Sequence, residues 1–227
     1  MRCHSEANNF LNATIYNFYP VLTIPCRSLA YMNYLAHAYL SFADAEILIG
    51  NMIADHVKGR IALEQYPAGI KKGIELHRKI DAFTDTHPAT GRARLWFKEK
   101  YGLYSGPITD ILYDHFLAMD PQCFPSAAHL LKFTEDTYTL LETQARWFPE
   151  KFAGYFPIMR THNWLYGYRT LQGMQRSLQG LERRAQHLPS TEAAYQTFIE
   201  YYYQLAQCYY ELMDDVVKYV KVELTRQ

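Results

Sequence analysis

The sequence predicts an all-α protein, a single compact helical domain, and three observations support this class. From residue 32 onward, apolar residues recur at the i, i+3, i+4 spacing of one helix face. Asp, Pro and Gly stand where these apolar stripes begin and end. No run of alternating apolar and polar residues is convincing enough to predict a strand. With 227 residues, of which 49% are hydrophobic, the chain can bury one full core.

Two helices are predicted before Gly59. One covers "NYLAHAYLSF" and carries His37 in a strongly apolar stretch. The other begins after Asp44, because Asp is a favourable N-cap, and ends at Gly59, a favourable C-terminal residue. Asn51 and Asp55 lie on this second helix at i, i+4 spacing. The sequence therefore places polar side chains inside two apolar helices.

The remaining helices are bounded mainly by prolines. Pro67 predicts the start of a helix through "AGIKKGIELHRKIDAFTD", which must end near Pro88. The segment "WFPEKFAGYFP" is rich in Pro and Gly and is expected to be irregular. Further helices are expected at about 89–100, 107–119, 126–146, 168–187 and 191–224.

Residues 1–31 differ from the rest of the chain. They show no helical period, and Pro20 and Pro25 interrupt their apolar stretch, so neither a signal peptide nor a membrane span is expected there. We interpret this segment as an extension that is disordered or loosely docked, with Met32 as the natural start. A single domain is then expected over residues 32–227.

Composition excludes several classes of protein. The formal net charge is +0, so no general affinity for nucleic acid is expected. No segment approaches the length of a transmembrane helix, and no membrane partner is expected. The four cysteines have neither zinc-knuckle spacing nor the pattern of a disulfide framework, which fits a reducing cytoplasm. They are Cys3, Cys26, Cys123 and Cys208.

Histidine and aspartate recur at four-residue intervals on the predicted helices. Two residues at i, i+4 are separated by about 40° and 6 Å of rise, so His77 and Asp81 can bind one cation from a single face. Asp110 and Asp114 repeat this spacing, and His115 follows directly. Four helices thus each present a carboxylate or an imidazole among apolar neighbours.

Some of these residues also have purely structural explanations. A lone histidine such as His37 on an apolar helix is more often a hydrogen-bonded core residue than a ligand. Asp85, before "THP", can belong to a helix end. Asp110, near the start of its helix, is well placed to interact with the helix dipole.

A metal site is the simplest explanation for the polar residues that lie well inside helices beside core positions: Asp55, His77, Asp81 and Asp114. Imidazole and carboxylate ligands without thiolates suit Mn²⁺, Mg²⁺, Fe²⁺ or Zn²⁺. Such a site typically activates water for attack on phosphorus, so hydrolysis is the expected reaction. Arg78 can reach a phosphate or equally pair with Glu75 or Asp81 at the surface.

Five motifs together resemble the acyl carrier protein phosphodiesterase family, the holo-acyl-carrier-protein hydrolases. They are "MNYLAHAYLSF", "GNMIADHVKG", "GIELHRKIDAFTDTHP", "ITDILYDHFLA" and "YFPIMRTHNWLYGYRTLQGMQRSL". The resemblance runs from Met32 to near the C-terminus in the family's order. It also makes Met32 similar to the usual first residue of the family.

This resemblance implies removal of the 4'-phosphopantetheine arm from holo-acyl carrier protein, with Mn²⁺ as the usual metal. The family is regarded as an unorthodox relative of the HD phosphohydrolases, which implies an HD-phosphohydrolase-like helical fold. The family's motif residues correspond in this sequence to Asp55 in the second motif and to His77, Arg78 and Asp81 in the third. In the fourth motif they correspond to Asp114 and His115. The superfamily's adjacent His-Asp doublet is absent, because His77 is followed by Arg78. The ligand assignment to Asp55, His77, Asp81 and Asp114 is thus inferred from helical geometry.

The hypothesis for the reaction gives catalytic roles to His37, Arg78 and His115. His115 or His37 would transfer protons, and Arg78 would stabilise charge on the phosphoryl oxygens. Two alternatives stay open. One is a metal-dependent phosphohydrolase of a nucleotide or another small phosphoester, and the other is a metal-free helical binding module.

An acidic protein substrate such as an acyl carrier protein should meet a basic surface. Although the formal net charge is +0, the chain has two basic segments, "GRARLWFKEK" and "RTLQGMQRSLQGLERR". Charge clusters of this kind are as often simply solvated helix faces. Docking of the carrier protein on one of these segments is therefore an expectation with an equally good structural alternative.

Overall fold

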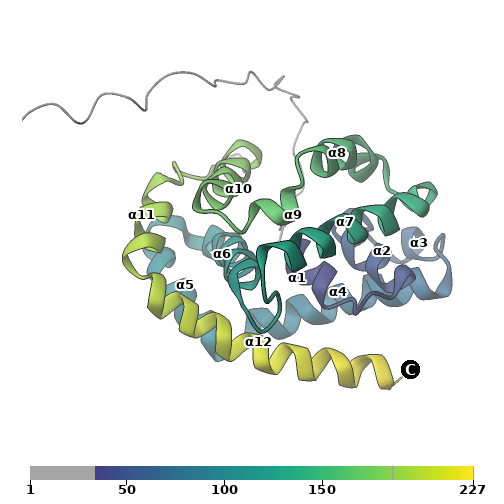
Figure 1. Ribbon diagram of the computed structural model, residues 1–227, viewed down its shortest axis with the longest axis horizontal. Helices are drawn as coiled ribbons and strands as arrows, with labels where there is room; N and C mark the ends of the chain where they lie inside the picture. The colour runs from purple at the N-terminus through teal and green to yellow at the C-terminus, as the bar shows by residue number, and fades with distance from the viewer. Residues whose placement is uncertain (1–33, 186, 227) are drawn as a thin grey trace, which may run out of the picture.

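Helices form all of the regular secondary structure in residues 34–185 and 187–226, the part of the chain that the computed structural model describes (Figure 1). The predicted all-α class is confirmed. The α-helices are α1 (Tyr34–Tyr39), α2 (Ala45–Ile53), α3 (Arg60–Leu63), α4 (Ala68–Thr86), α5 (Pro88–Tyr101), α6 (Ser105–Met119), α7 (Ala127–Thr143), α8 (Glu150–Thr161), α9 (Trp164–Gly167), α10 (Leu171–Arg184), α11 (Glu192–Glu200) and α12 (Tyr202–Thr225). Three short 3₁₀ turns join them: η1 (Ala54–His56), η2 (Gly102–Tyr104) and η3 (Ala145–Trp147). The expectation for residues 1–31 lies outside the described residues.

Helices α2 and α4 make the closest helix pair of the fold, and two glycines allow their approach. A Cβ added to Gly50 would lie 2.2 Å from the carbonyl oxygen of Ile70. A Cβ added to Gly73 would lie 2.4 Å from the carbonyl oxygen of Ile47. Both distances are far below van der Waals contact, so only glycine fits at these two positions. The backbones therefore touch, and the polar residues of α2 reach those of α4.

Helix α6 lies at the centre of the molecule and is almost completely buried, from Ser105 to Ala118. It packs against α1, α5 and α10 (Figure 1). Because apolar side chains cover nearly all its faces, the few polar residues on it must find partners in the core. Two of these residues are Asp114 and His115.

The C-terminal helix α12 runs along α5 and α4 at the edge of the molecule (Figure 1). Two ion pairs hold it there. Lys79 of α4 pairs with Glu223 at 2.8 Å, and His87, the residue between α4 and α5, pairs with Asp215 at 3.4 Å. The rings of Phe83 and Tyr219 stack between them. This packing supports the outer face of α4, whose inner face carries His77 and Asp81.

The segment predicted to be irregular contains the greater part of helix α8, so that prediction is wrong. Phe148, Phe152 and Phe156 recur at four-residue intervals and pack on one another, with Phe148 and Phe152 centroids 4.7 Å apart. Pro157 lies inside the helix and removes one backbone donor. The buried aromatic face outweighs this loss, which composition alone does not reveal.

Two predicted helix ends also differ from the structure. The helix expected up to Gly59 ends at Ile53 and continues as the 3₁₀ turn η1, which carries Asp55. The last helix is divided at Tyr201 into α11 and α12. Neither break is marked by a proline or glycine, so the apolar period runs through both. None of the described helices is long and apolar enough to cross a membrane.

Candidate metal centre

Three side chains from two helices form a compact group of metal-ligand type. They are His37 on α1 and His77 and Asp81 on α4, with one ligand atom from each lying within 4.8 Å of the others. Nε2 of His37 lies 3.2 Å from Oδ1 of Asp81, and Nε2 of His77 lies 3.2 Å from Oδ2 of the same carboxylate. The predicted i, i+4 partnership of His77 and Asp81 is thus present in the structure.

Asn51 on α2 sets the orientation of both imidazole rings. Nδ1 of His37 donates to Oδ1 of Asn51 at 2.8 Å, and Nδ1 of His77 donates to the main-chain oxygen of Asn51 at 2.8 Å. The Asn51 amide is itself fixed, because its Nδ2 donates to the His37 carbonyl and to Oγ of Ser41. With Nδ1 of each histidine used as a donor, each Nε2 is directed to Asp81. Outer-shell hydrogen bonds of this kind orient histidine ligands at metal sites.

Nε2 of His37 lacks a hydrogen-bond partner inside this group. His37 is 1% exposed and its Nε2 has no hydrogen bond, although the Asp81 carboxylate is near. A neutral imidazole with Nδ1 protonated presents a lone pair at Nε2, and a lone pair facing a carboxylate is unfavourable. A cation between the two removes this conflict. The buried, unpartnered Nε2 therefore fits a metal ion better than a hydrogen-bonded core histidine.

The pKa values of the three side chains reflect the charges that they hold close together. Burial opposes protonation of His77, but the carboxylates of Asp55 and Asp81 raise its pKa to about 10. Burial likewise opposes ionisation of Asp81, yet the two imidazoles hold the pKa of its carboxyl well below the usual range. Burial and the neighbouring His77 lower the pKa of His37. The site thus favours one bound positive charge, which a proton or a divalent cation can supply.

Asp55 lies at the edge of this group. Its Oδ1 is 3.6 Å from Nε2 of His77, and its side chain is 15% exposed. It is presented by the turn η1, since α2 ends two residues earlier. Imidazole nitrogens and carboxylate oxygens without thiolates suit Mn²⁺, Fe²⁺, Zn²⁺ or Mg²⁺, so the donor set fits the metals predicted from the sequence.

Asp114, which the sequence predicts to be a metal ligand, accepts hydrogen bonds from the backbone of α1. Its Oδ1 and Oδ2 accept hydrogen bonds from the backbone amides of Ala36 and Leu35, at 2.9 and 3.1 Å. It therefore holds the first turn of α1, the helix that carries His37. Burial raises the pKa of this carboxyl to about 8, although the two amides lower it. The sequence pattern could not show this, because α6 meets α1 at the amides of its N-terminus.

His115 also lies apart from the metal-ligand group. Its Nδ1 bonds the carbonyl oxygen of Tyr168 at 2.7 Å, and its ring packs edge-on against Phe198 and Tyr202. Burial lowers its pKa, so the imidazole is neutral. Successive helix residues point about 100° apart, so Asp114 and His115 face different neighbours. Among the described contacts of His115, none reaches the residues of the metal-ligand group.

The other predicted polar residues have distinct environments. Arg78 donates from Nη2 to the carbonyl oxygen of Val57 at 2.9 Å and is otherwise exposed. Asp85 pairs with Arg94 of α5 at 2.5 Å, a structural role at the end of α4. Asp110 lies beyond the first turn of α6, so the helix dipole does not explain it. Burial and the nearby charge of Asp81 raise its pKa well above the ordinary value.

Sequence reasoning missed a polar chain beside the site. The hydroxyl of Tyr155 on α8 bonds Nε2 of His56 at 2.7 Å and also contacts the hydroxyl of Tyr34. Because the sequence predicts an irregular segment in place of α8, it gives no reason to single out Tyr155. His56 follows Asp55, so this chain adjoins the metal-ligand group.

The fold and this site define an all-helical protein with a buried histidine–aspartate group of the kind that binds a divalent cation. Residues 32–216 match the family model described as acyl carrier protein phosphodiesterase. The chain therefore belongs to the acyl carrier protein phosphodiesterase family, and its predicted class as an enzyme is confirmed.

Curated relatives agree with this membership. The chain is 34% identical over 140 residues to an acyl carrier protein phosphodiesterase of Photorhabdus laumondii, which covers 62% of this chain and 70% of the relative. It is 32% identical over 140 residues to the protein of that name from Serratia proteamaculans, covering 62% and 72%. The match to the protein of that name from Salmonella paratyphi A is 31% over 144 residues, covering 63% and 74%. No solved structure matches the chain.

Proposed function

We propose that this protein hydrolyses the phosphodiester that links 4'-phosphopantetheine to the serine of an acyl carrier protein, and that it requires a divalent metal. Family membership supports the substrate, because the relatives carry the name of this reaction. The observation that carries the metal requirement is the unpartnered, buried Nε2 of His37 facing Asp81.

In this proposal His37, His77 and Asp81 hold the metal, and Asp55 is the fourth ligand. His37 thus changes from the proton-transfer role expected from the sequence to a ligand, while Asp114 positions α1. A divalent cation at this site supplies Lewis-acid chemistry, lowering the pKa of water and neutralising phosphoryl oxygens. Mn²⁺ is the first choice, as the family resemblance implies.

Arg78 is suited to bind the phosphoryl group of the substrate. One N–H of its guanidinium is used on the carbonyl of Val57, which fixes the side chain beside η1 and Asp55. A guanidinium has five N–H donors, so the others remain able to bind phosphoryl oxygens. The Asp81 side chain is 38% exposed, and the metal-ligand group is therefore open to solvent on this side.

The second basic segment, which includes α10, is the proposed docking surface for the carrier protein. In the first basic segment, Arg92 pairs with Glu211 and Arg94 with Asp85, so much of its charge is neutralised. Within the described chain, no ion pair involves the four arginines of the second segment: Arg169, Arg176, Arg183 and Arg184. Such a substrate also implies a cytoplasmic protein. Association with the carrier should weaken steeply as salt is added.

The test is to incubate the protein with holo-carrier protein and Mn²⁺ and to weigh the carrier by mass spectrometry. The expected result is loss of the phosphopantetheine mass, blocked by a chelator and restored by added Mn²⁺. A small phosphodiester and a nucleotide are tested in parallel. Cleavage of these two compounds with intact holo-carrier would favour a small-molecule phosphohydrolase instead.

A further inference from the structure

The last two residues of α10 are arginines whose guanidinium groups converge. A Cβ placed on Gly180 would lie 3.3 Å from Nη1 of Arg184 and 3.8 Å from Nη2 of Arg183. Both cations therefore lie over the same glycine, one turn back along the helix. Two like charges held this close repel each other unless an anion lies between them.

Neither arginine has an anionic partner among the described residues. No ion pair or hydrogen bond joins Arg183 or Arg184 to another described side chain, whereas other arginines of the chain do pair with carboxylates. Those paired arginines are Arg92, Arg94, Arg160 and Arg226. The pair at the end of α10 is thus an uncompensated positive charge.

The surroundings of Arg184 make this charge costly. The side chain is half-buried, and burial lowers the pKa of its guanidinium. Tyr34, Tyr168 and Tyr155 act on it electrostatically, as does Arg183. Burial raises the pKa of each of these phenols, so they stay neutral. A half-buried cation beside neutral hydroxyls suits an incoming oxyanion.

These tyrosines connect Arg184 to the metal-ligand group. The hydroxyls of Tyr34 and Tyr155 contact each other, and Tyr155 bonds His56. Asp55, the neighbour of His56, acts electrostatically on both tyrosines and lies 3.6 Å from Nε2 of His77. Arg184 and Asp55 therefore act electrostatically on the same two tyrosines, Tyr34 and Tyr155.

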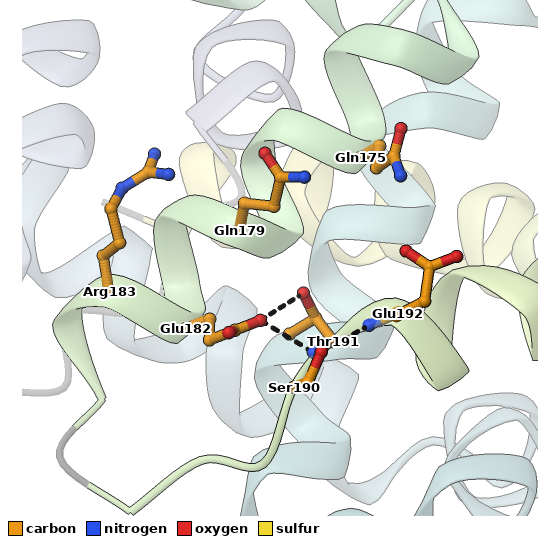
Figure 2. Close-up of a pocket in the computed structure, with 7 residues that line it drawn as sticks. All are labelled: Gln175, Gln179, Glu182, Arg183, Ser190, Thr191 and Glu192. Atoms are coloured by element: carbon orange, nitrogen blue, oxygen red, sulfur yellow. Dashed lines mark hydrogen bonds between the residues drawn. The ribbon is translucent and has the colours of Figure 1, made fainter. Parts of the chain in front are cut away.

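The simplest structural explanation accounts for only one member of the pair. Basic residues in the last turn of a helix interact favourably with its dipole, and exposed Arg183 fits that role. Figure 2 shows Arg183 on α10 in line with Gln179, both lining a surface pocket between α10 and the start of α11. A half-buried Arg184 is not needed for the dipole interaction, because an exposed side chain makes it at lower desolvation cost.

We propose that Arg184, with Arg183 beside it, binds an oxyanion of the substrate next to the metal-ligand group. This inference rests on the proposed function and gives two residues of its docking surface a specific ligand. The oxyanion has two sources within one substrate, the phosphodiester group of the arm and a side-chain carboxylate of the carrier protein. Guanidinium groups bind either chemistry by paired N–H donors.

The variants that test this are Arg184→Met and Arg184→Lys, with Arg176→Met as control. Arg176 lies exposed on the same helix and belongs to the proposed docking surface. Its replacement therefore measures what the loss of one docking charge costs on holo-carrier, without touching the pair. Thermal unfolding, binding of inorganic phosphate to the chelator-treated protein, and kcat/KM on holo-carrier and on bis(4-nitrophenyl) phosphate are measured. Loss of a charge-assisted hydrogen bond corresponds to about a 10- to 100-fold weaker interaction.

We expect Arg184→Met to unfold at the same or a higher temperature than the control and to lose oxyanion binding, with partial recovery in Arg184→Lys. Weaker phosphate binding with slower cleavage of both substrates identifies the phosphodiester as the anion. A loss confined to holo-carrier and larger than that of Arg176→Met identifies a carrier carboxylate. Phosphate binding and kcat/KM equal to those of Arg176→Met would overturn the proposal, as would a lower unfolding temperature, which indicates a structural role. If the unmodified protein does not cleave holo-carrier, the proposed function fails, while phosphate binding still decides the role of Arg184.

Discussion

The imidazole rings of His37 and His77 stack face to face, with centroids 3.9 Å apart and planes inclined by 19°. They come from helices α1 and α4, and one residue of a third helix, Asn51, bonds Nδ1 of both. Two protonated imidazoles would not stack in this way, because their charges would repel. The arrangement therefore disfavours protonation of both rings at once, and a cation bound through the two Nε2 atoms would leave both rings neutral.

Replacing Asn51 by alanine should weaken metal binding without removing any ligand. His37 would lose its Nδ1 partner, while His77 would keep the main-chain oxygen. Loss of an outer-shell partner typically costs 10- to 100-fold in metal affinity, and we expect an effect of about this size for Mn²⁺ measured by calorimetric titration. Ser41→Ala is the control, since it leaves the bond between Asn51 and Nδ1 of His37 intact. It removes only Oγ, which accepts from the Asn51 amide and donates to the His37 carbonyl. Equal affinity in Asn51→Ala and the unmodified protein would contradict this role.

Asp81→Asn and Asp85→Asn form a matched pair one turn apart on α4. Asp81 bridges the two imidazoles, whereas Asp85 pairs with Arg94. We expect Asp81→Asn to lose bound metal and turnover by more than the roughly 100-fold of an outer-shell change, and Asp85→Asn to keep both. Metal that binds only the folded state raises the unfolding temperature, so a chelator should lower it in Asp85→Asn but not in Asp81→Asn. Metal analysis and thermal unfolding measure this, and similar metal content in the two variants would refute the assignment.

The sequence predicts the helices well where the apolar period has clear ends, as for α4 between Pro67 and Pro88. It fails where side-chain packing decides. The aromatic face of Phe148, Phe152 and Phe156 makes α8 helical in spite of Pro157. A local pattern cannot weigh such contacts, because they depend on which neighbours the segment meets.

For the site, spacing within one helix is informative and relations between helices are not. The i, i+4 rule brings His77 and Asp81 together, since both lie on α4. Whether α1 presents His37 to them, or α6 presents Asp114 to the amides of α1, depends on helix packing. The sequence does not reveal that packing directly. Only the structure shows that His37 lies in the metal-ligand group and that Asp114 binds the amides of α1.

Asp114 should make the metal-free protein less stable as the pH rises from about 4 to 8. In the folded state its pKa is about 8, above the ordinary value, so the folded protein keeps a proton that the unfolded chain has released. A folded state that binds more protons loses stability with rising pH, at about 1.4 kcal/mol per pH unit for one proton. We expect Asp114→Asn to lack this slope between pH 5 and 6.5.

Urea unfolding of the chelator-treated proteins at several pH values measures the difference. His77, with its raised pKa, gives a slope of the same sign above about pH 6.5, but both proteins share it. Asparagine cannot accept from both amides as a carboxylate does, so a general loss of about 1–3 kcal/mol is also expected. Parallel pH profiles for the two proteins would show that Asp114 does not titrate in this range.

Gly50→Ala should separate α2 from α4 and thereby weaken both the fold and the site. The added Cβ would lie 2.2 Å from the backbone oxygen of Ile70, which cannot move aside like a side chain, so we expect a loss of about 1–3 kcal/mol or more. Gly154→Ala in α8 is the control, because nothing lies within 4 Å of its added Cβ, and it should gain about 0.4–1 kcal/mol. Since α2 carries Asn51 and α4 carries His77, Gly50→Ala should also lower Mn²⁺ affinity while Gly154→Ala leaves it unchanged. Urea unfolding and metal titration test both effects, and a Gly50→Ala protein as stable as the unmodified one would show that the helices can move apart without cost.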